Sequence, residues 1–269
     1  MAAGEPVRGC RHQEVSPGPP GRAPAAAGTA GHTRDRPPPS RVRAWRALWR
    51  FSVPAALAGL FTALAVMVAP GSGPVWALDR AVSRDAGRLA AAHPAVTAAA
   101  SAVTELGDWR AGLPALAACA GLAAWRARSP GPALRAALAA GILIVLVVLV
   151  KWLTARPGPG GAPGDGLGFF PSGHTALAII CYGMGIWLLA ARTARALRAA
   201  ARALAVAAVL AVSACLVWCR YHWLSDVVAS WALSGLELWA LFLTPLAAGR
   251  PDGGPGSLHA PPKACTQDQ

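Results

Sequence analysis

The chain has 269 residues, of which 55% are hydrophobic and only 14% are charged, and its formal net charge is +13. This balance is poor for a soluble domain and typical of a polytopic membrane protein. The arginines stand in short clusters between apolar segments, which argues against nucleic-acid binding. The abundance of arginine, alanine, glycine and proline indicates a GC-rich, bacterial genome. No C-x-x-C pair occurs among the six cysteines, which argues against a zinc site.

Both ends of the chain are predicted to be disordered. Residues 1–45 and 249–269 are rich in proline, glycine and polar residues. Such a composition cannot bury enough apolar surface to fold. We therefore expect two disordered cytoplasmic tails on either side of a membrane domain over residues 46–248.

Six apolar segments between the tails predict transmembrane helices. They are residues 51–69, 111–125, 133–152, 174–191, 203–219 and 224–246. A spanning helix needs about 20 mostly apolar residues, so the second and fifth segments are short by this measure. Residues 75–108 mix charge with alanine and are expected to form one or two helices at the membrane surface. The predicted fold class is all-α, a polytopic membrane bundle of six transmembrane helices.

The arginine clusters predict the orientation of these helices. Clusters precede the first segment and join the second to the third and the fourth to the fifth, and Arg250 follows the sixth. With six spans all four of these regions lie on one side, which the positive-inside rule makes the cytoplasm. The extracytoplasmic side then carries residues 75–110, the loop 153–173 and the turn 219–224. The expected localisation is the plasma membrane, with a multi-pass chain.

A lysine and an arginine begin the loop that follows the third apolar segment. Lys151 ends that segment, and Arg156 follows five residues later. Taken alone, Lys151 would be interpreted as a lysine that snorkels to the membrane surface. Two further polar motifs on the same side favour a functional interpretation.

The first of these motifs is Pro171-Ser172-Gly173-His174, directly before the fourth apolar segment. Ser172 suits a helix N-cap, and Gly173 allows another group to approach the backbone closely. The free N–H groups at the start of a helix bind anions, phosphate especially. His174 would lie in the first turn. The simpler alternative is an ordinary cap followed by an incidental interfacial histidine.

The second motif lies at the start of the sixth apolar segment. His222 and Asp226 are four residues apart and would share one face of a helix. A carboxylate that accepts Nδ1–H fixes the histidine tautomer and leaves Nε2 free to attack or to take a proton. The simpler alternative, a capping histidine near an unrelated aspartate, is disfavoured because ionisable groups at an apolar helix are costly. Arg220 lies two residues before His222.

The predicted topology brings these groups to one side of the membrane. Cations and helix N–H groups can hold and neutralise the oxygens of a phosphoryl group. One histidine can attack phosphorus while the other protonates the leaving oxygen. No cofactor or metal is expected, because the pattern lacks the additional carboxylates of a magnesium or two-metal site.

These motifs resemble the type 2 phosphatidic acid phosphatase superfamily, the membrane lipid phosphate phosphatases. The family pattern is K-x6-R-P, then P-S-G-H, then S-R-x5-H-x3-D, on the non-cytoplasmic side of a six-helix core. The resemblance covers roughly residues 51–246. It implies that His222 is the nucleophile that becomes phosphohistidine, that Asp226 orients it, and that His174 protonates the leaving group. It further implies phosphate contacts from Lys151, Ser172 and Gly173.

Both arginine positions differ from the family pattern. The first family arginine should fall at Gly158, whereas Arg156 is two residues early. The second should fall at Leu216, whereas Arg220 is four residues later, one helical turn along roughly the same face. We expect Arg156 and Arg220 to bind the phosphate in place of the family arginines.

The expected function is an integral membrane phosphatase that hydrolyses a lipid phosphate monoester or pyrophosphate, such as undecaprenyl pyrophosphate or phosphatidic acid. The alternatives are a lipid phosphotransferase and a non-catalytic membrane protein that binds lipid phosphates. The expected partners are the lipid substrate and the bilayer, not nucleic acid. Glu237, inside the sixth segment, is expected to be protonated and to form an interhelical hydrogen bond.

Overall fold

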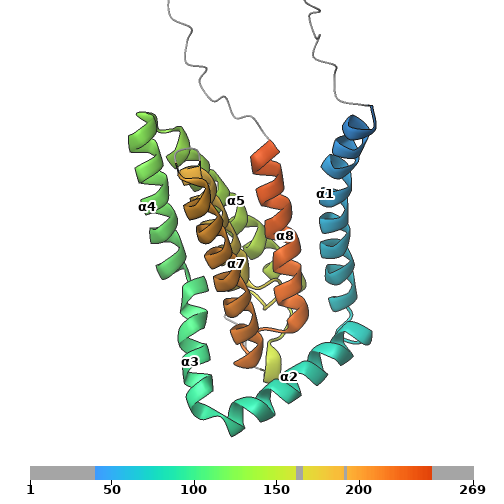
Figure 1. The fold of residues 1–269 in the computed structure, drawn as a ribbon. Helices are drawn as coiled ribbons and strands as arrows, with labels where there is room; N and C mark the ends of the chain where they lie inside the picture. The colour runs from blue at the N-terminus through green and yellow to red at the C-terminus, as the bar shows by residue number, and fades with distance from the viewer. Residues whose placement is uncertain (1–39, 162–165, 191–192, 244–269) are drawn as a thin grey trace, which may run out of the picture. The chain divides into compact units, whose positions relative to one another are not determined.

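The structure is a computed structural model that describes residues 40–161, 166–190 and 193–243. Over these ranges the regular elements are helices, so the predicted all-α class is confirmed (Figure 1). They are α1 (Ser40–Val68), α2 (Pro74–Ala92), α3 (Pro94–Thr104), η1 (Glu105–Gly107), α4 (Trp109–Ala127), α5 (Gly131–Thr154), η2 (Pro159–Gly161), α6 (Gly173–Leu189), α7 (Arg195–Trp218) and α8 (Leu224–Leu243).

Contacts divide the chain into two compact units, residues 1–44 and 45–269. The site lies in the second unit. The tails predicted over 1–45 and 249–269 lie outside the described residues, apart from the first residues of α1, which begins at Ser40.

Helices occupy all six of the predicted transmembrane segments. The segment 51–68 of α1 and the whole of α5 and α7 are long and apolar enough to cross a membrane, and α6 is a shorter apolar helix. Large apolar side chains such as Phe51, Val145 and Leu204 are exposed on these helices. Apolar side chains turned outward are expected where lipid, not water, surrounds the protein.

Helix α6 is at the centre of the bundle and contacts α4, α5, α7 and α8. Its small residues allow these neighbours to approach closely. A Cβ at Gly185 would lie 3.2 Å from the sulfur of Cys119 on α4, and a Cβ at Gly183 would lie 2.9 Å from Leu238 Cδ1 on α8. The helix that begins with the P-S-G-H motif is therefore fixed by packing on several sides.

The predicted surface segment 75–108 forms α2, α3 and η1. Helix α2 buries one face, with Trp76, Asp79, Ser83 and Ala86 at helical spacing. It contacts α7 and α8, and α3 contacts α7, across the end of the bundle where α7 ends and α8 begins (Figure 1). Asp79 is the exception on this buried face, because a carboxylate is costly to bury without a partner.

Candidate active site

The three polar motifs meet at one end of the bundle, as the predicted topology requires. The backbone N–H of Ser172 donates to the carbonyl of Asp226 (3.2 Å) and so joins the start of α6 to α8. Ser230 Oγ donates to the carbonyl of Ser172 (2.8 Å). The ammonium of Lys151 donates to the carbonyl of Gly168 (2.9 Å), in the segment that leads into α6.

The start of α6 has the geometry of a capped helix. Ser172 is the N-cap, and its hydroxyl accepts a hydrogen bond from the backbone N–H of Thr175 (3.4 Å). A Cβ at Gly173 would lie 4.0 Å from Lys151 Cε, so the lysine side chain passes beside this glycine. The first N–H groups of a helix have no partner in a preceding turn and can bind an anion. The predicted N-cap is confirmed.

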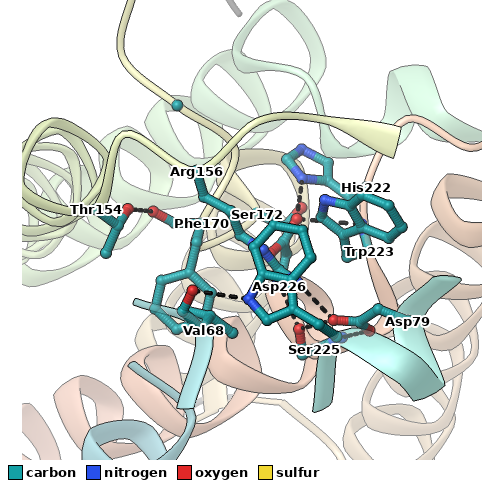
Figure 2. A network of polar contacts seen from close by, with 12 residues as sticks. Val68, Asp79, Thr154, Arg156, Phe170, Ser172, His222, Trp223, Ser225 and Asp226 are labelled. Atoms are coloured by element: carbon teal, nitrogen blue, oxygen red, sulfur yellow. Dashed lines mark hydrogen bonds and ion pairs between the residues drawn. The ribbon is translucent and has the colours of Figure 1, made fainter. Parts of the chain in front are cut away.

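His222 is buried and is oriented by Asp226. Its Nδ1 lies 3.3 Å from Asp226 Oδ2, which also accepts the backbone N–H of Trp223 (3.1 Å) (Figure 2). The ring of Phe169 packs edge-on against the imidazole, with centroids 5.6 Å apart. His222 lies in the turn just before α8, not on the helix itself. An imidazole held through Nδ1–H leaves the Nε2 lone pair as the reactive atom.

His174 faces a carboxylate that the sequence analysis did not single out. Its Nε2 lies 3.7 Å from Asp108 Oδ2, and Asp108 is the N-cap of α4. The side chain of His174 is 38% exposed, whereas that of His222 is 8% exposed. The more accessible histidine is the one better placed to exchange a proton with a leaving group or with water.

His174 lines a cavity of about 250 Å³ whose lining is mostly apolar. The cavity is lined by Gly107, Asp108, Trp109, Leu143, Ile144, Val147, Val148, Gly173, His174 and Leu177. A larger cavity of about 590 Å³ between α2, α7 and α8 has no histidine or lysine in its lining. We assign the smaller cavity to the site, because His174 and Gly173 of the P-S-G-H motif line it.

Arg156 is placed among carboxylates. Its Nη2 donates to Asp79 Oδ2 (2.6 Å), and its Nη1 donates to Ser225 Oγ (2.7 Å) and to Asp226 Oδ1 (Figure 2). The guanidinium is 1% exposed, and Nε is buried without a hydrogen-bond partner among the described residues. Arg156 is therefore connected to His222 through its ion pair with Asp226.

The family pattern places its first arginine at Gly158, where the ring of Phe169 occupies the space that a side chain would need. A Cβ at Gly158 would lie 2.5 Å from Phe169 Cζ, so no larger side chain fits there while Phe169 covers His222. The position for the second arginine, Leu216, is fully buried on α7. Neither family position could hold an arginine here unless its neighbours were repacked.

Arg220 reaches from the α7–α8 turn towards α2. Its φ is +58°, a left-handed conformation that is uncommon for residues other than glycine. Its Nε donates to Ser83 Oγ (3.2 Å). A Cβ at Gly160 would lie 3.1 Å from Arg220 Nη2, so the guanidinium also lies against the loop after α5. This is the loop that carries Arg156, and Arg220 is the exposed arginine of the pair.

Glu237 lies within α8. Both carboxylate oxygens of Glu237 are buried without a hydrogen-bond partner in the described part of the chain. The interhelical hydrogen bond predicted for Glu237 is therefore not found there.

No cluster of three or more His, Cys, Asp or Glu side chains that could hold a metal ion occurs within the described ranges.

Comparison with known proteins confirms the resemblance seen in the motifs. Residues 132–250 match the family model of the PAP2 superfamily. A similar solved structure is the crystal structure of the first transmembrane PAP2 type phosphatidylglycerolphosphate phosphatase from Bacillus subtilis. It is 21% identical, with a TM-score of 0.64 over 70% of this chain and 94% of that chain. The search of curated proteins found no match. The chain therefore has a PAP2 membrane phosphatase-like fold.

Proposed function

We propose that this chain, which shares the PAP2 fold, is an integral membrane phosphatase that hydrolyses a lipid phosphate monoester or pyrophosphate through a phosphohistidine. The observation that carries the proposal is the geometry of His222. Asp226 holds its Nδ1, and Asp226 is itself joined through its backbone to Ser172, the N-cap of α6. This geometry supports a nucleophile held beside a helix start that can bind an anion.

The reaction has two steps, and His174 transfers a proton in each of them. The Nε2 lone pair of His222 attacks phosphorus, the P–O bond to the lipid breaks, and the leaving oxygen takes a proton from His174. Water then attacks phosphorus and gives a proton back to His174, while the P–N bond breaks, the electron pair returns to His222 Nε2, and inorganic phosphate leaves. The imidazolium charge that develops on His222 is stabilised by Asp226.

The phosphoryl oxygens are held by the remaining polar groups of the site. Lys151 supplies a positive charge, and Ser172 and Gly173 supply the start of α6. Arg220 is the arginine we assign to the phosphate, because its guanidinium is the more exposed and lies by the loop 156–161. Arg156 was expected to share this role, but both of its Nη atoms bind protein oxygens.

The cavity at His174 favours a lipid as the substrate. Its lining includes apolar residues of α5 and α6 together with two polar side chains, His174 and Asp108. A phosphate headgroup with an apolar tail matches both parts. Undecaprenyl pyrophosphate, phosphatidic acid and phosphatidylglycerol phosphate all have this chemistry, on the extracytoplasmic leaflet that we propose faces the site.

Phosphate release by the purified protein in detergent with EDTA tests the proposal. Undecaprenyl pyrophosphate, phosphatidic acid and phosphatidylglycerol phosphate would be compared in wild type, in His222→Ala and in His93→Ala, an exposed histidine between α2 and α3 as the matched control. We expect release in wild type and in the control and none in His222→Ala. Equal release by wild type and His222→Ala would contradict the proposal.

The same assay separates the two alternative functions. A phosphotransferase would transfer the phosphoryl group from His222 to an added alcohol and release little inorganic phosphate. A non-catalytic binder would retain lipid phosphates and turn over none of them. Product analysis with and without an added acceptor alcohol distinguishes these outcomes from hydrolysis.

A further inference from the structure

We propose that Asp79 and Arg156 form a positioning clamp that holds Asp226, and through it His222, and that Arg156 does not bind the substrate phosphate. This inference rests on the proposed function and assigns two residues to it. Asp79 lies on α2, 147 positions before Asp226 in the numbering of the chain, and no spacing in the sequence connects the two.

The first observation is that the guanidinium is shared between two carboxylates. Arg156 Nη2 donates to Asp79 Oδ2 (2.6 Å), and Nη1 donates to Asp226 Oδ1. The three side chains are 1%, 1% and 0% exposed for Arg156, Asp79 and Asp226. A planar guanidinium can bridge two carboxylates in fixed geometry, whereas an ammonium acts as a point charge.

The second observation is that Ser225 closes the network. Its backbone N–H donates to Asp79 Oδ1 (3.0 Å), and its hydroxyl donates to Asp79 Oδ2 while accepting from Arg156 Nη1 (2.7 Å). Ser225 precedes Asp226 directly. Asp79 therefore holds the first turn of α8 as well as the guanidinium, and Asp226 is held through both its neighbour and its own Oδ1 (Figure 2).

The third observation is that aromatic rings enclose Arg156. Its guanidinium carbon lies 4.3 Å from the ring centroid of Trp76 on α2 and 5.4 Å from that of Trp223. Trp223 Nε1 donates to the carbonyl of Pro157 (2.8 Å), which fixes the indole against the loop. Carboxylates and rings surround the guanidinium, both Nη atoms bind protein oxygens, and Nε is buried, so the side chain is not accessible to a phosphoryl oxygen.

The net charge of the clamp is suited to the positive charge that develops on His222 during the reaction. With both carboxylates ionised, Asp79, Arg156 and Asp226 together carry one net negative charge. Arg156 alone would neutralise Asp226, and Asp79 restores the negative charge. That charge can balance the imidazolium that forms when His222 Nε2 bonds to phosphorus.

The test compares Asp79→Asn with Asp85→Asn, an exposed carboxylate on the same helix. Arg156→Lys is the second variant, because a lysine retains the charge but cannot bridge two carboxylates. For each protein, kcat and KM are measured with a lipid phosphate, together with the inhibition constant of inorganic phosphate. We expect kcat to fall on the order of 10²-fold in Asp79→Asn and in Arg156→Lys, because a small displacement of the nucleophile is enough for such a loss.

The inhibition constant of inorganic phosphate is expected to change less than about twofold in both variants, since neither side chain contacts the phosphate. The double variant should lose little more than either single variant, because residues that act as one unit are not additive. A large rise in the inhibition constant of Arg156→Lys with kcat retained would overturn the proposal and make Arg156 a phosphate ligand. Wild-type kcat in Asp79→Asn would overturn it as well.

A spectroscopic measurement keeps the test independent of turnover. The ring ¹⁵N shifts of His222 report which nitrogen carries the proton, in protein without any substrate. We expect one tautomer, with the proton on Nδ1, in wild type and Asp85→Asn, and a mixture in Asp79→Asn. The same tautomer in all three proteins would refute the clamp. Because this readout needs no activity, it separates failure of the clamp from failure of the proposed phosphatase reaction.

Ser225→Ala replaces Asp79→Asn if that variant does not fold. It removes one hydroxyl and no charge, and we expect it to give the same mixture of His222 tautomers.

Discussion

At the level of single residues, the two histidines differ in burial and in partner. His222 is buried and held through Nδ1 by Asp226, whereas His174 is partly exposed and faces Asp108 at 3.7 Å. This difference supports the roles proposed above, with the fixed imidazole as the nucleophile and the accessible one in proton transfer. The assignment has a consequence that depends on the leaving group.

Replacement of His174 by alanine should slow hydrolysis of a lipid monoester by about 10²- to 10⁴-fold, the usual contribution of general acid catalysis. A pyrophosphate has a better leaving group and should lose much less. Rates for phosphatidic acid and undecaprenyl pyrophosphate measured side by side, with His93→Ala as control, check this. Equal losses on the two substrates would contradict the role given to His174.

Gly158 should not tolerate a side chain. A Cβ there would lie 2.5 Å from Phe169, the ring that covers His222. Gly158→Ala should lower the free energy of unfolding by about 1–3 kcal/mol, as expected for overpacking. Gly121→Ala on α4, where nothing lies within 4 Å of the new Cβ, is the control and should be neutral or stabilising. Thermal unfolding in detergent measures both, and equal midpoints would contradict the packing described.

At the level of elements, local sequence patterns predicted the helices and the motifs, but they could not predict contacts between residues that are far apart in the sequence. The cap at Ser172 and the pair His222–Asp226 were predictable, because each lies within four residues. Asp79 was not, because its contact with Arg156 spans 77 positions and α2 reads as an ordinary amphipathic helix. The buried aspartate among apolar positions on one face of α2 was the available signal.

The docking of α2 should depend on its buried tryptophan. Trp76 packs against Arg156 and Trp223 and donates to the carbonyl of Val68 (2.8 Å). Trp76→Ala should cost about 3–5 kcal/mol of stability, the range for large buried side chains. Trp109→Ala, at an indole that is 57% exposed, is the control. If both variants unfold at the same temperature, α2 is not held by this contact.

At the level of the whole molecule, composition and charge predicted a membrane protein, and the fold confirms an all-helical PAP2-like bundle. The orientation of the bundle stays a prediction from the arginine clusters. The α7–α8 turn carries the site, and the α4–α5 turn lies next to an arginine cluster. These two turns are expected on opposite sides of the membrane.

Single cysteines in a cysteine-free background test the orientation. Tyr221→Cys, at a position that is 47% exposed in the α7–α8 turn, should react with a membrane-impermeant maleimide added outside intact cells. Ser129→Cys, between α4 and α5, should react only after the cells are opened. The reverse pattern would place the site in the cytoplasm and contradict the positive-inside assignment.

Capture of the covalent intermediate would test the proposed phosphohistidine on His222 directly. The purified protein would be mixed with ³²P-labelled lipid phosphate, quenched in alkali within milliseconds, and digested, and the labelled peptide would be sequenced by mass spectrometry. We predict a phosphoryl group on His222 that is stable in alkali and labile in acid, absent in His222→Ala and present in His93→Ala. Phosphate release without any label on His222, or label on another residue, would contradict it.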